Sequence, residues 1–105
     1  MVVARDAGPS DLRARSIGII LANQAPSGAF VAGPTFSQYG YAWFRDGAFI
    51  AEALDLVGEH EASTRFHGWV TRVVLSRRQA MERAMARVTA GSVPDPADVL
   101  HCRYT

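Results

Sequence analysis

Apolar residues recur at helical spacing in three stretches of the chain. The first stretch begins at Ser10-Asp11, a helix-start signal, and keeps its apolar positions up to about Ala22. A second helix is predicted from Asp46, because this residue type caps helices and its charge suits a helix N-terminus. Gly58 is expected to close that helix, whose apolar face is predicted to consist of Phe49, Ile50, Ala53, Leu54 and Val57.

The third stretch runs from near Glu61 and carries its apolar stripe at Ala62, Phe66, Trp69, Val70, Val73, Val74, Ala80, Met81, Ala84, Met85 and Val88. A continuous helix here would have about 29 residues and a length of roughly 43 Å. A compact chain of this size has a radius of gyration of only about 13 Å. Arg77 also falls on the stripe. Either the helix breaks near Ser76, or Arg77 meets a polar partner that these residues do not supply.

Residues 27–47 have no helical period and are rich in glycine, small and aromatic residues. Loops of this length in compact domains are usually functional or disordered, and the aromatic density argues against disorder. Sugars bind to the groups found here, since aromatic faces contact their C–H surfaces and charged groups bind their hydroxyls. These groups belong to Tyr39, Tyr41, Trp43, Arg45 and Asp46. The alternative is that the rings fill a core and that Arg45 and Asp46 form a surface cap.

Composition narrows the class of protein. The chain has 105 residues, 49% of them hydrophobic and 20% charged, with a net charge of +1, which suits at most one domain and argues against both disorder and a dedicated nucleic-acid binder. It has no apolar run of about 18 residues and no signal peptide, so a cytoplasmic protein without a membrane span is expected. Cys102 is the only cysteine, and with His101 it makes no metal-ligand spacing.

The aromatic segment resembles the N-terminal part of the glucoamylase family, glycoside hydrolase family 15. The resemblance covers nearly the whole chain from about Asp11 and is carried by Ser27-Gly28-Ala29-Phe30, Tyr39-x-Tyr41-x-Trp43-x-Arg45-Asp46, Gly47–Ala51, Phe66-x-x-Trp69 and His101–Thr105. It implies an all-α fold, the first helices of an (α/α)6 toroid that is incomplete in this chain. Residues 1–105 would then be the N-terminal part of the catalytic domain, truncated and without a complete domain.

The resemblance also implies a function and a set of roles. The family inverts the anomeric centre while it releases a glucosyl unit from the non-reducing end of α-linked glucose, and it needs no cofactor. Arg45 and Asp46 would bind hydroxyls of the terminal glucosyl unit. Tyr39 would lie against the ring where oxocarbenium character develops, Trp43 would line the pocket wall, and Tyr41 would support the loop. Ser27 and Gly28 would shape the loop that brings these groups to the pocket.

No catalytic residue is assigned within the chain. Inverting hydrolysis needs a general acid and a general base with carboxyl groups roughly 6.5–9.5 Å apart. In the family both are glutamates well downstream of the Arg-Asp motif, and no carboxylate here matches either one. Glu52, the only other carboxylate near the motif, is interpreted as a helix-surface or supporting residue.

The expected function is therefore a fragment of a glycosidase that is inactive alone, with no metal. Its expected partners are a saccharide of α-linked glucose and the remainder of the barrel, and neither nucleic acid nor membrane. Two alternatives stay open: a non-catalytic helical module that binds sugar, and a helical interaction domain in which the aromatic segment is core.

Overall fold

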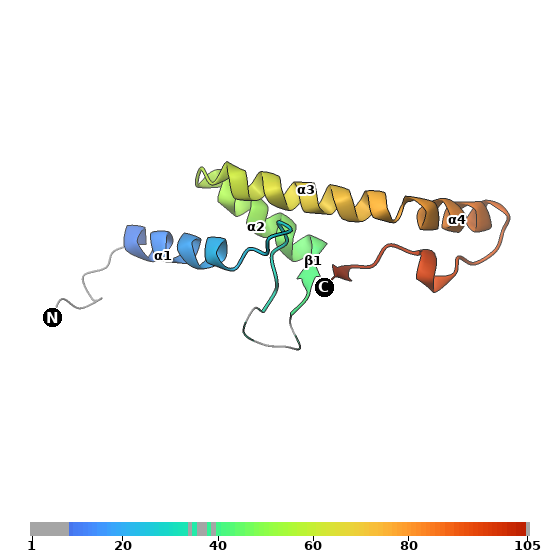
Figure 1. The fold of residues 1–105 in the computed structure, drawn as a ribbon, viewed down its shortest axis with the longest axis horizontal. Helices are drawn as coiled ribbons and strands as arrows, with labels where there is room; N and C mark the ends of the chain where they lie inside the picture. The colour runs from blue at the N-terminus through green and yellow to red at the C-terminus, as the bar shows by residue number, and fades with distance from the viewer. Residues whose placement is uncertain (1–8, 34, 36–37, 39, 105) are drawn as a thin grey trace.

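The computed structural model describes residues 9–33, 35, 38 and 40–104, and it is elongated. Its principal extents are 69 × 28 × 22 Å and its radius of gyration is 18.3 Å. A compact chain of this length would have a radius of gyration of about 13 Å. Figure 1 shows α1 toward one end of the long axis and α4 toward the other, with α2 beside α3 between them, while the C-terminus returns to the middle of the molecule beside β1. This is not the shape of a chain that folds around one central core.

Helices dominate the described residues, so the predicted all-α class is confirmed. The elements in chain order are α1 (Pro9–Ala22), β1 (Ala42–Trp43), α2 (Phe44–Leu56), α3 (His60–Ser76), α4 (Arg78–Thr89), the 3-10 helix η3 (Pro96–Asp98) and β2 (Arg103–Tyr104). The two short strands form an antiparallel pair. This pair was not expected from the sequence, because two-residue strands leave no periodic pattern.

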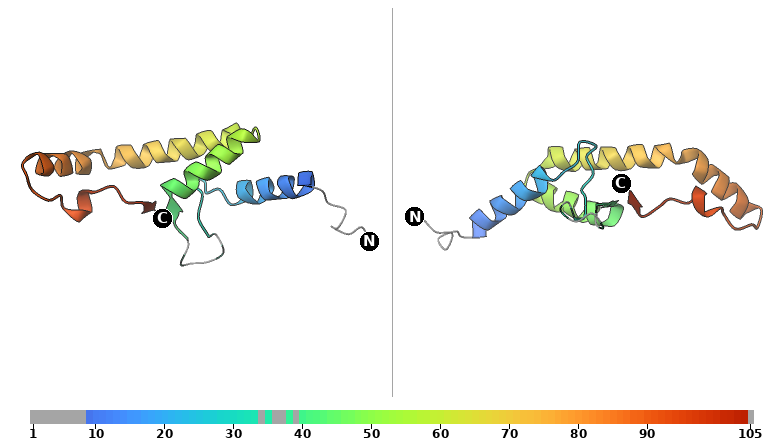
Figure 2. Two further views of the ribbon diagram at one scale, coloured as in Figure 1. Left: turned by 180° about the vertical axis from the view of Figure 1, so that it is seen from behind. Right: turned by 60° about the horizontal axis from the view of Figure 1, so that its bottom comes forward.

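The core lies between α2 and α3, which run side by side in Figures 1 and 2. Phe66 is 1% exposed, and its ring stacks on that of Phe30 with the ring centroids 5.6 Å apart. Gly47 allows this packing, since a Cβ there would lie 2.2 Å from the Phe66 ring. The other buried hydrophobic members of the cluster are Ala29, Ala42, Ala51, Leu54, Ala62 and Trp69.

The predicted face of α2 is partly wrong. The helix turns Gly47, Ala51 and Leu54 toward the core, whereas Phe49 is 68% exposed. The close approach of Gly47 to Phe66 decides this orientation, and a count of apolar positions gives a glycine no weight. The predicted N-cap is also wrong, because the helix begins at Phe44 and Asp46 lies in its first turn.

Gly58 ends the α2 segment as expected. It has a φ of 88°, a backbone conformation that glycine adopts without steric penalty. The Glu59 N–H donates to the Leu54 carbonyl over 2.8 Å, and the Gly58 N–H donates to the Asp55 carbonyl over 3.1 Å. Together these bonds form the glycine-based helix ending that satisfies the last carbonyls of a helix.

The long third helix breaks at Arg77, which confirms one of the two alternatives. Arg77 has φ −99° and ψ 7°, and Figure 2 shows α4 turning away from the axis of α3. The Ser76 hydroxyl donates to the Val73 carbonyl over 2.7 Å, a local bond of the kind that bends helices. Arg77 nevertheless has partners within the chain, since its guanidinium donates to the carbonyls of Ala97 and Val99. The other alternative, a polar partner from outside these residues, is therefore not the one that the structure shows.

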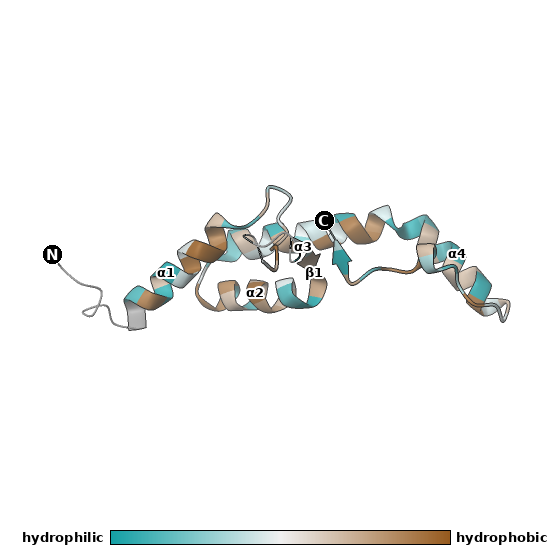
Figure 3. Ribbon diagram, turned by 90° about the horizontal axis from the view of Figure 1, so that it is seen from below, coloured by the Kyte–Doolittle hydropathy of each residue, from teal (hydrophilic) through white to brown (hydrophobic). Residues whose placement is uncertain are grey.

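Large apolar side chains remain exposed outside the core. Figure 3 shows hydrophobic segments on α1 and α4, at the two ends of the molecule. Leu12 and Ile19 of α1 are exposed, as are Met85 and Val88 of α4, so the apolar stripe continues past the break without a surface to cover it. Within the described part of the chain, no helix combines the length and the apolar character needed to cross a membrane.

Candidate functional site

The strand β1 divides the aromatic segment between two faces. Successive side chains of a strand point to opposite sides. Ala42 is buried, and its register partner in β2 is Tyr104. Tyr41 and Trp43 flank Ala42, are half-buried, and lie on the opposite side from it. The register partner of Trp43 is Arg103.

The inward side of this pair belongs to the core. Phe44, the first residue of α2, packs with its ring centroid 5.5 Å from that of Trp69 and 5.0 Å from that of Tyr104. Trp69 and Tyr104 meet edge to face at 6.1 Å. These rings hold β2 against the α2–α3 pair. The core alternative is thus correct for Phe44, whereas Tyr41 and Trp43 lie on the other side.

The loop before β1 is fastened to α3. Gly28 has a φ of 102°, and a Cβ there would lie 2.2 Å from the Arg65 carbonyl oxygen, so only glycine fits this approach. The Arg65 guanidinium donates to the carbonyls of Ala25 and Pro26, each over 3.2 Å. The Ser27 hydroxyl accepts from the Ala29 N–H over 3.3 Å. Ser27 and Gly28 therefore take part in shaping this loop, as the resemblance implied.

Arg45 and Asp46 lie in the first turn of α2 and face solvent. Their side chains are 76% and 41% exposed, and the Arg45 Nε is 3.4 Å from the Asp46 Oδ1. The negative charge of Asp46 is favourable at the N-terminus of a helix. Among the described residues this single long contact is the one recorded for the two side chains, so it leaves most guanidinium donors and carboxylate acceptors for a polar ligand.

Arg103 joins this group, although no role was predicted for it. Its guanidinium carbon lies 4.5 Å from the centroid of the Tyr41 ring and 6.0 Å from that of the Trp43 ring. These are distances at which a cation is attracted to an aromatic face. The sequence showed Arg103 only as part of the family-like ending, and the strand pairing that brings it to Tyr41 left no signal.

Four of the five predicted sugar-binding residues can thus be located. Trp43, Arg45 and Asp46 follow one another from β1 into α2, and Arg103 connects Trp43 with Tyr41. The fifth, Tyr39, lies outside the described residues. None of these four residues lines the apolar pocket of about 190 Å³ between α1, the loop and α2, which is formed by Ile19, Ile20, Asn23, Phe30, Val31, Ala32 and Ile50.

Two carboxylates have shifted pKa values, and both serve structure. Hydrogen bonds from His60 and Ser63, each 2.8 Å long, hold the pKa of Asp55 below its ordinary value and join the end of α2 to the start of α3. A hydrogen bond from Arg83, 2.9 Å long, does the same for the pKa of Asp98. A general acid needs a raised pKa, so neither carboxylate suits that role. Glu52 is exposed on α2.

A metal centre finds no support in the described ranges. No group of three or more histidine, cysteine, aspartate or glutamate side chains among them could hold a metal ion. What the arrangement offers is an exposed surface with two half-buried rings and ionised donors and acceptors. Such a surface can bind a polyhydroxylated ligand through ring faces and hydroxyl contacts.

The chain is similar to known glycosidases over most of its length. The profile of glycosyl hydrolases family 15 matches residues 10–99. The isomaltose glucohydrolase of Kribbella flavida is 41% identical over 96 residues, which cover 90% of this chain and 25% of that protein. Two solved structures, a glycosidase variant in complex with glucose and a wild-type glycosidase, each show 41% identity and a TM-score of 0.85. They are matched over 90% of this chain and 26% of theirs, so the chain spans about a quarter of the length of these relatives.

Proposed function

The chain belongs to glycosyl hydrolases family 15, and from that premise we propose that residues 1–105 are the N-terminal part of a catalytic domain that hydrolyses α-glucosides with inversion. The chain would supply part of the pocket for the terminal glucosyl unit. The observation that carries this proposal is the exposed Arg45–Asp46 pair at the start of α2, beside the half-buried rings of Tyr41 and Trp43.

Each group has a role that its chemistry supports. Arg45 donates to vicinal hydroxyls of the glucosyl unit, and Asp46 accepts from them, because charged hydrogen bonds are the stronger ones. Trp43 forms the pocket wall through its ring face, and Tyr41, on the same side of the strand, supports the segment beside it. Tyr39 is assigned to the ring carbon where positive charge develops.

The substrate class proposed is a saccharide with α-linked glucose at its non-reducing end. Isomaltose is the probe of choice, since the relative from Kribbella flavida is named for it. Calorimetric titration of the purified chain with isomaltose should give a saturable binding curve. Cellobiose, a β-linked disaccharide of glucose, is the matched control and should bind more weakly. Equal binding of both sugars, or no binding of isomaltose by the folded chain, contradicts the proposal.

The chemical step is assigned to carboxylates outside this chain. Water attacks the anomeric carbon with help from a general base, and a general acid protonates the leaving oxygen. The site holds Asp46, which the proposal uses for binding, and the carboxylates of Asp55 and Asp98 are engaged elsewhere. We therefore expect no release of glucose from isomaltose by the chain alone. Measurable release that is lost on Glu52→Gln would overturn this assignment.

The partner proposed for the exposed apolar faces is the remainder of the barrel. Phe49 and Leu56 are 68% and 79% exposed, and both lie on the side of α2 turned away from the core. The matched relatives have about three times as much further chain with which to cover such a face. Exposed apolar surface of this kind commonly marks an interface.

Co-expression tests this partner directly. The chain is produced together with a polypeptide that comprises the unmatched part of the Kribbella flavida relative. We expect the two to copurify and to release glucose from isomaltose. The double variant Phe49→Asp, Leu56→Asp should remain folded, because both residues are exposed, and should lose copurification. Copurification that this variant leaves unchanged contradicts the assignment of the face.

One observation favours a second candidate, a non-catalytic module that binds sugar. Among the described residues near the motif, Asp46 is assigned to binding and the exposed Glu52 is the only further carboxylate, so the two carboxyl groups that hydrolysis needs are not both supplied there. This candidate predicts isomaltose binding without any gain of activity from the co-expressed polypeptide. The same two experiments therefore separate the candidates.

A further inference from the structure

We infer that Arg103 is a positioning residue for the sugar-binding surface: its guanidinium fixes the rings of Tyr41 and Trp43. The inference rests on the proposed function for its consequence, since Trp43 is assigned to the wall of the sugar pocket and Tyr41 to the support of that segment. It concerns a residue far from the motif in sequence, which the β1–β2 pair brings beside Tyr41 and Trp43.

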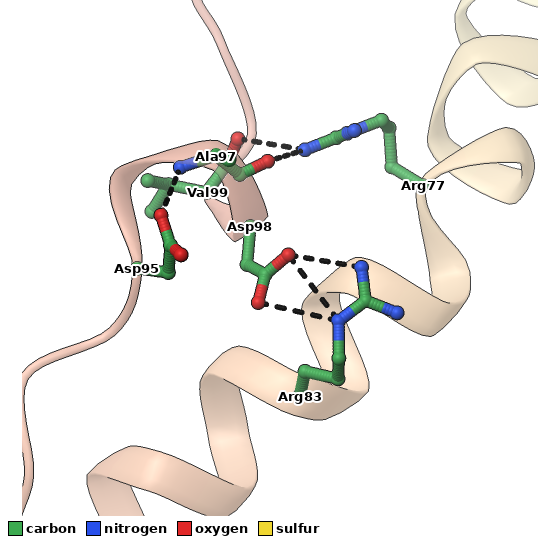
Figure 4. A network of polar contacts seen from close by, with 6 residues as sticks. All are labelled: Arg77, Arg83, Asp95, Ala97, Asp98 and Val99. Atoms are coloured by element: carbon green, nitrogen blue, oxygen red, sulfur yellow. Dashed lines mark hydrogen bonds and ion pairs between the residues drawn. The ribbon is translucent and has the colours of Figure 1, made fainter.

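The C-terminal segment is anchored at the break between α3 and α4 (Figure 4). Arg77, at the helix break, donates to the carbonyls of Ala97 and Val99. Arg83 of α4 donates to Asp98 over 2.9 Å, and the Asp98 side chain is only 14% exposed. η3 is thus tied to the residue at the break and to α4.

From η3 the chain returns toward β1, in the middle of the molecule, as Figure 1 shows. The His101 N–H donates to the Tyr104 hydroxyl over 3.0 Å, and the Tyr104 ring packs on Phe44. Tyr104 therefore fixes β2 from the inward side. Because strand residues alternate, the same register directs Arg103 to the outward side.

The Arg103 guanidinium contacts both aromatic rings on this outward side. At 4.5 Å from the Tyr41 centroid it lies on the ring, and at 6.0 Å it also reaches Trp43. A planar guanidinium stacks on aromatic rings and stays charged at any working pH. The two rings are exposed enough to move without such a contact, since both are only half-buried. Arg103 thereby orders the rings before a sugar arrives, and an ordered site binds with a smaller entropic cost.

The experiment compares Arg103→Met, which keeps the length but not the charge, with Arg103→Lys, which keeps a cation. Arg13→Met, an exposed arginine on α1, is the matched control. Three quantities are measured for the full chain: the isomaltose dissociation constant by calorimetry, the melting temperature, and the NMR signal of the Trp43 indole N–H, assigned with Trp43→Phe.

We expect Arg103→Met to raise the isomaltose dissociation constant about fivefold, because it removes one exposed cation–π contact. Arg103→Lys should stay within about twofold of the wild type, and all melting temperatures should agree within a few degrees. The Trp43 indole signal should shift in Arg103→Met and much less in Arg103→Lys.

The indole signal separates this inference from the proposed function. If the wild type binds no isomaltose while the Trp43 signal still responds to Arg103→Met, ring positioning is supported and the sugar function fails. If the signal and the dissociation constant are unchanged in a folded Arg103→Met protein, the inference is overturned. A melting temperature that falls equally in the Met and Lys variants also overturns it, because the arginine would then serve the strand pair alone.

Discussion

The two sides of the β1–β2 pair have different chemistry although the same two strands form both. The inward side presents Ala42 and Tyr104 to Phe44 and Trp69, and the Tyr104 ring packs against the rings of these two residues. The outward side presents Tyr41, Trp43 and Arg103, followed by the exposed Arg45–Asp46 pair.

Burial separates what each side contributes. Removing a buried side chain costs free energy of folding, whereas exposed charged groups contribute little to stability. A side that combines half-buried rings with exposed ion pairs is not required by the fold, so its composition points to a ligand. One segment thus carries core packing on one side and the residues proposed to bind sugar on the other.

The largest effect is expected from breaking the inward side. Phe66→Ala removes the ring on which Phe30 stacks and against which Gly47 packs. We expect a loss of about 3–5 kcal/mol in the free energy of unfolding, measured by urea denaturation. Isomaltose binding should fall only as far as the folded population falls. A loss below about 1 kcal/mol would contradict the placement of Phe66 at the centre of the core.

The next effect is expected from the outward side. Arg45→Ala removes an exposed group assigned to the sugar, and we expect isomaltose affinity to fall at least about tenfold, the loss of one charged hydrogen-bond partner. The melting temperature should stay within a few degrees, since the side chain is 76% exposed. Calorimetry measures the isomaltose affinity and thermal unfolding measures the melting temperature, on one preparation of the variant. A stability loss without an affinity loss would favour the helical interaction domain.

A smaller effect concerns acid stability, which belongs to the α2–α3 packing. Contacts with His60 and Ser63 lower the pKa of Asp55 in the folded chain. A lowered pKa adds stability above the ordinary aspartate value of about 3.9, and this stability is lost as the pH falls through the folded value. Asp55→Asn should therefore weaken the decline of the melting temperature in acid. The exposed Asp11→Asn is the control, and an equal effect of both substitutions would remove Asp55 from this role.

The smallest effect is expected for Glu52→Gln. Glu52 is exposed and lies six residues after Asp46 on the same helix. Neither isomaltose affinity nor the melting temperature should change, whereas Asp46→Asn should lower the affinity. If only Asp46→Asn lowers the isomaltose affinity, the sugar contact is confined to the start of α2. A similar loss of affinity in both variants would show that the contact extends along the helix.

The sequence predicted what its periodicity encodes. The apolar stripe of α3 with Ala62, Phe66 and Trp69 is buried as expected, and Arg77 on that stripe indicated the break. The face of α2 was missed because Gly47 packs through the absence of a side chain. The β1–β2 pair was missed because its strands are too short to alternate visibly.

The candidate site shows the same division. Arg45, Asp46, Tyr41 and Trp43 were found because they stand together in one short segment that resembles a known family, and their role in binding stays a prediction. Arg103 was missed because only the three-dimensional path of the C-terminal segment brings it to Tyr41.

The most direct test of the account is an NMR titration of the wild-type chain with isomaltose. The account predicts saturable shifts for the amides of Arg45 and Asp46 and for the Trp43 indole, while the indole of the buried Trp69 stays in place. Such a result would assign the sugar to the outward side of the β1–β2 pair. A folded chain that shows no shifts, or shifts at Trp69 without any at Trp43, would contradict it.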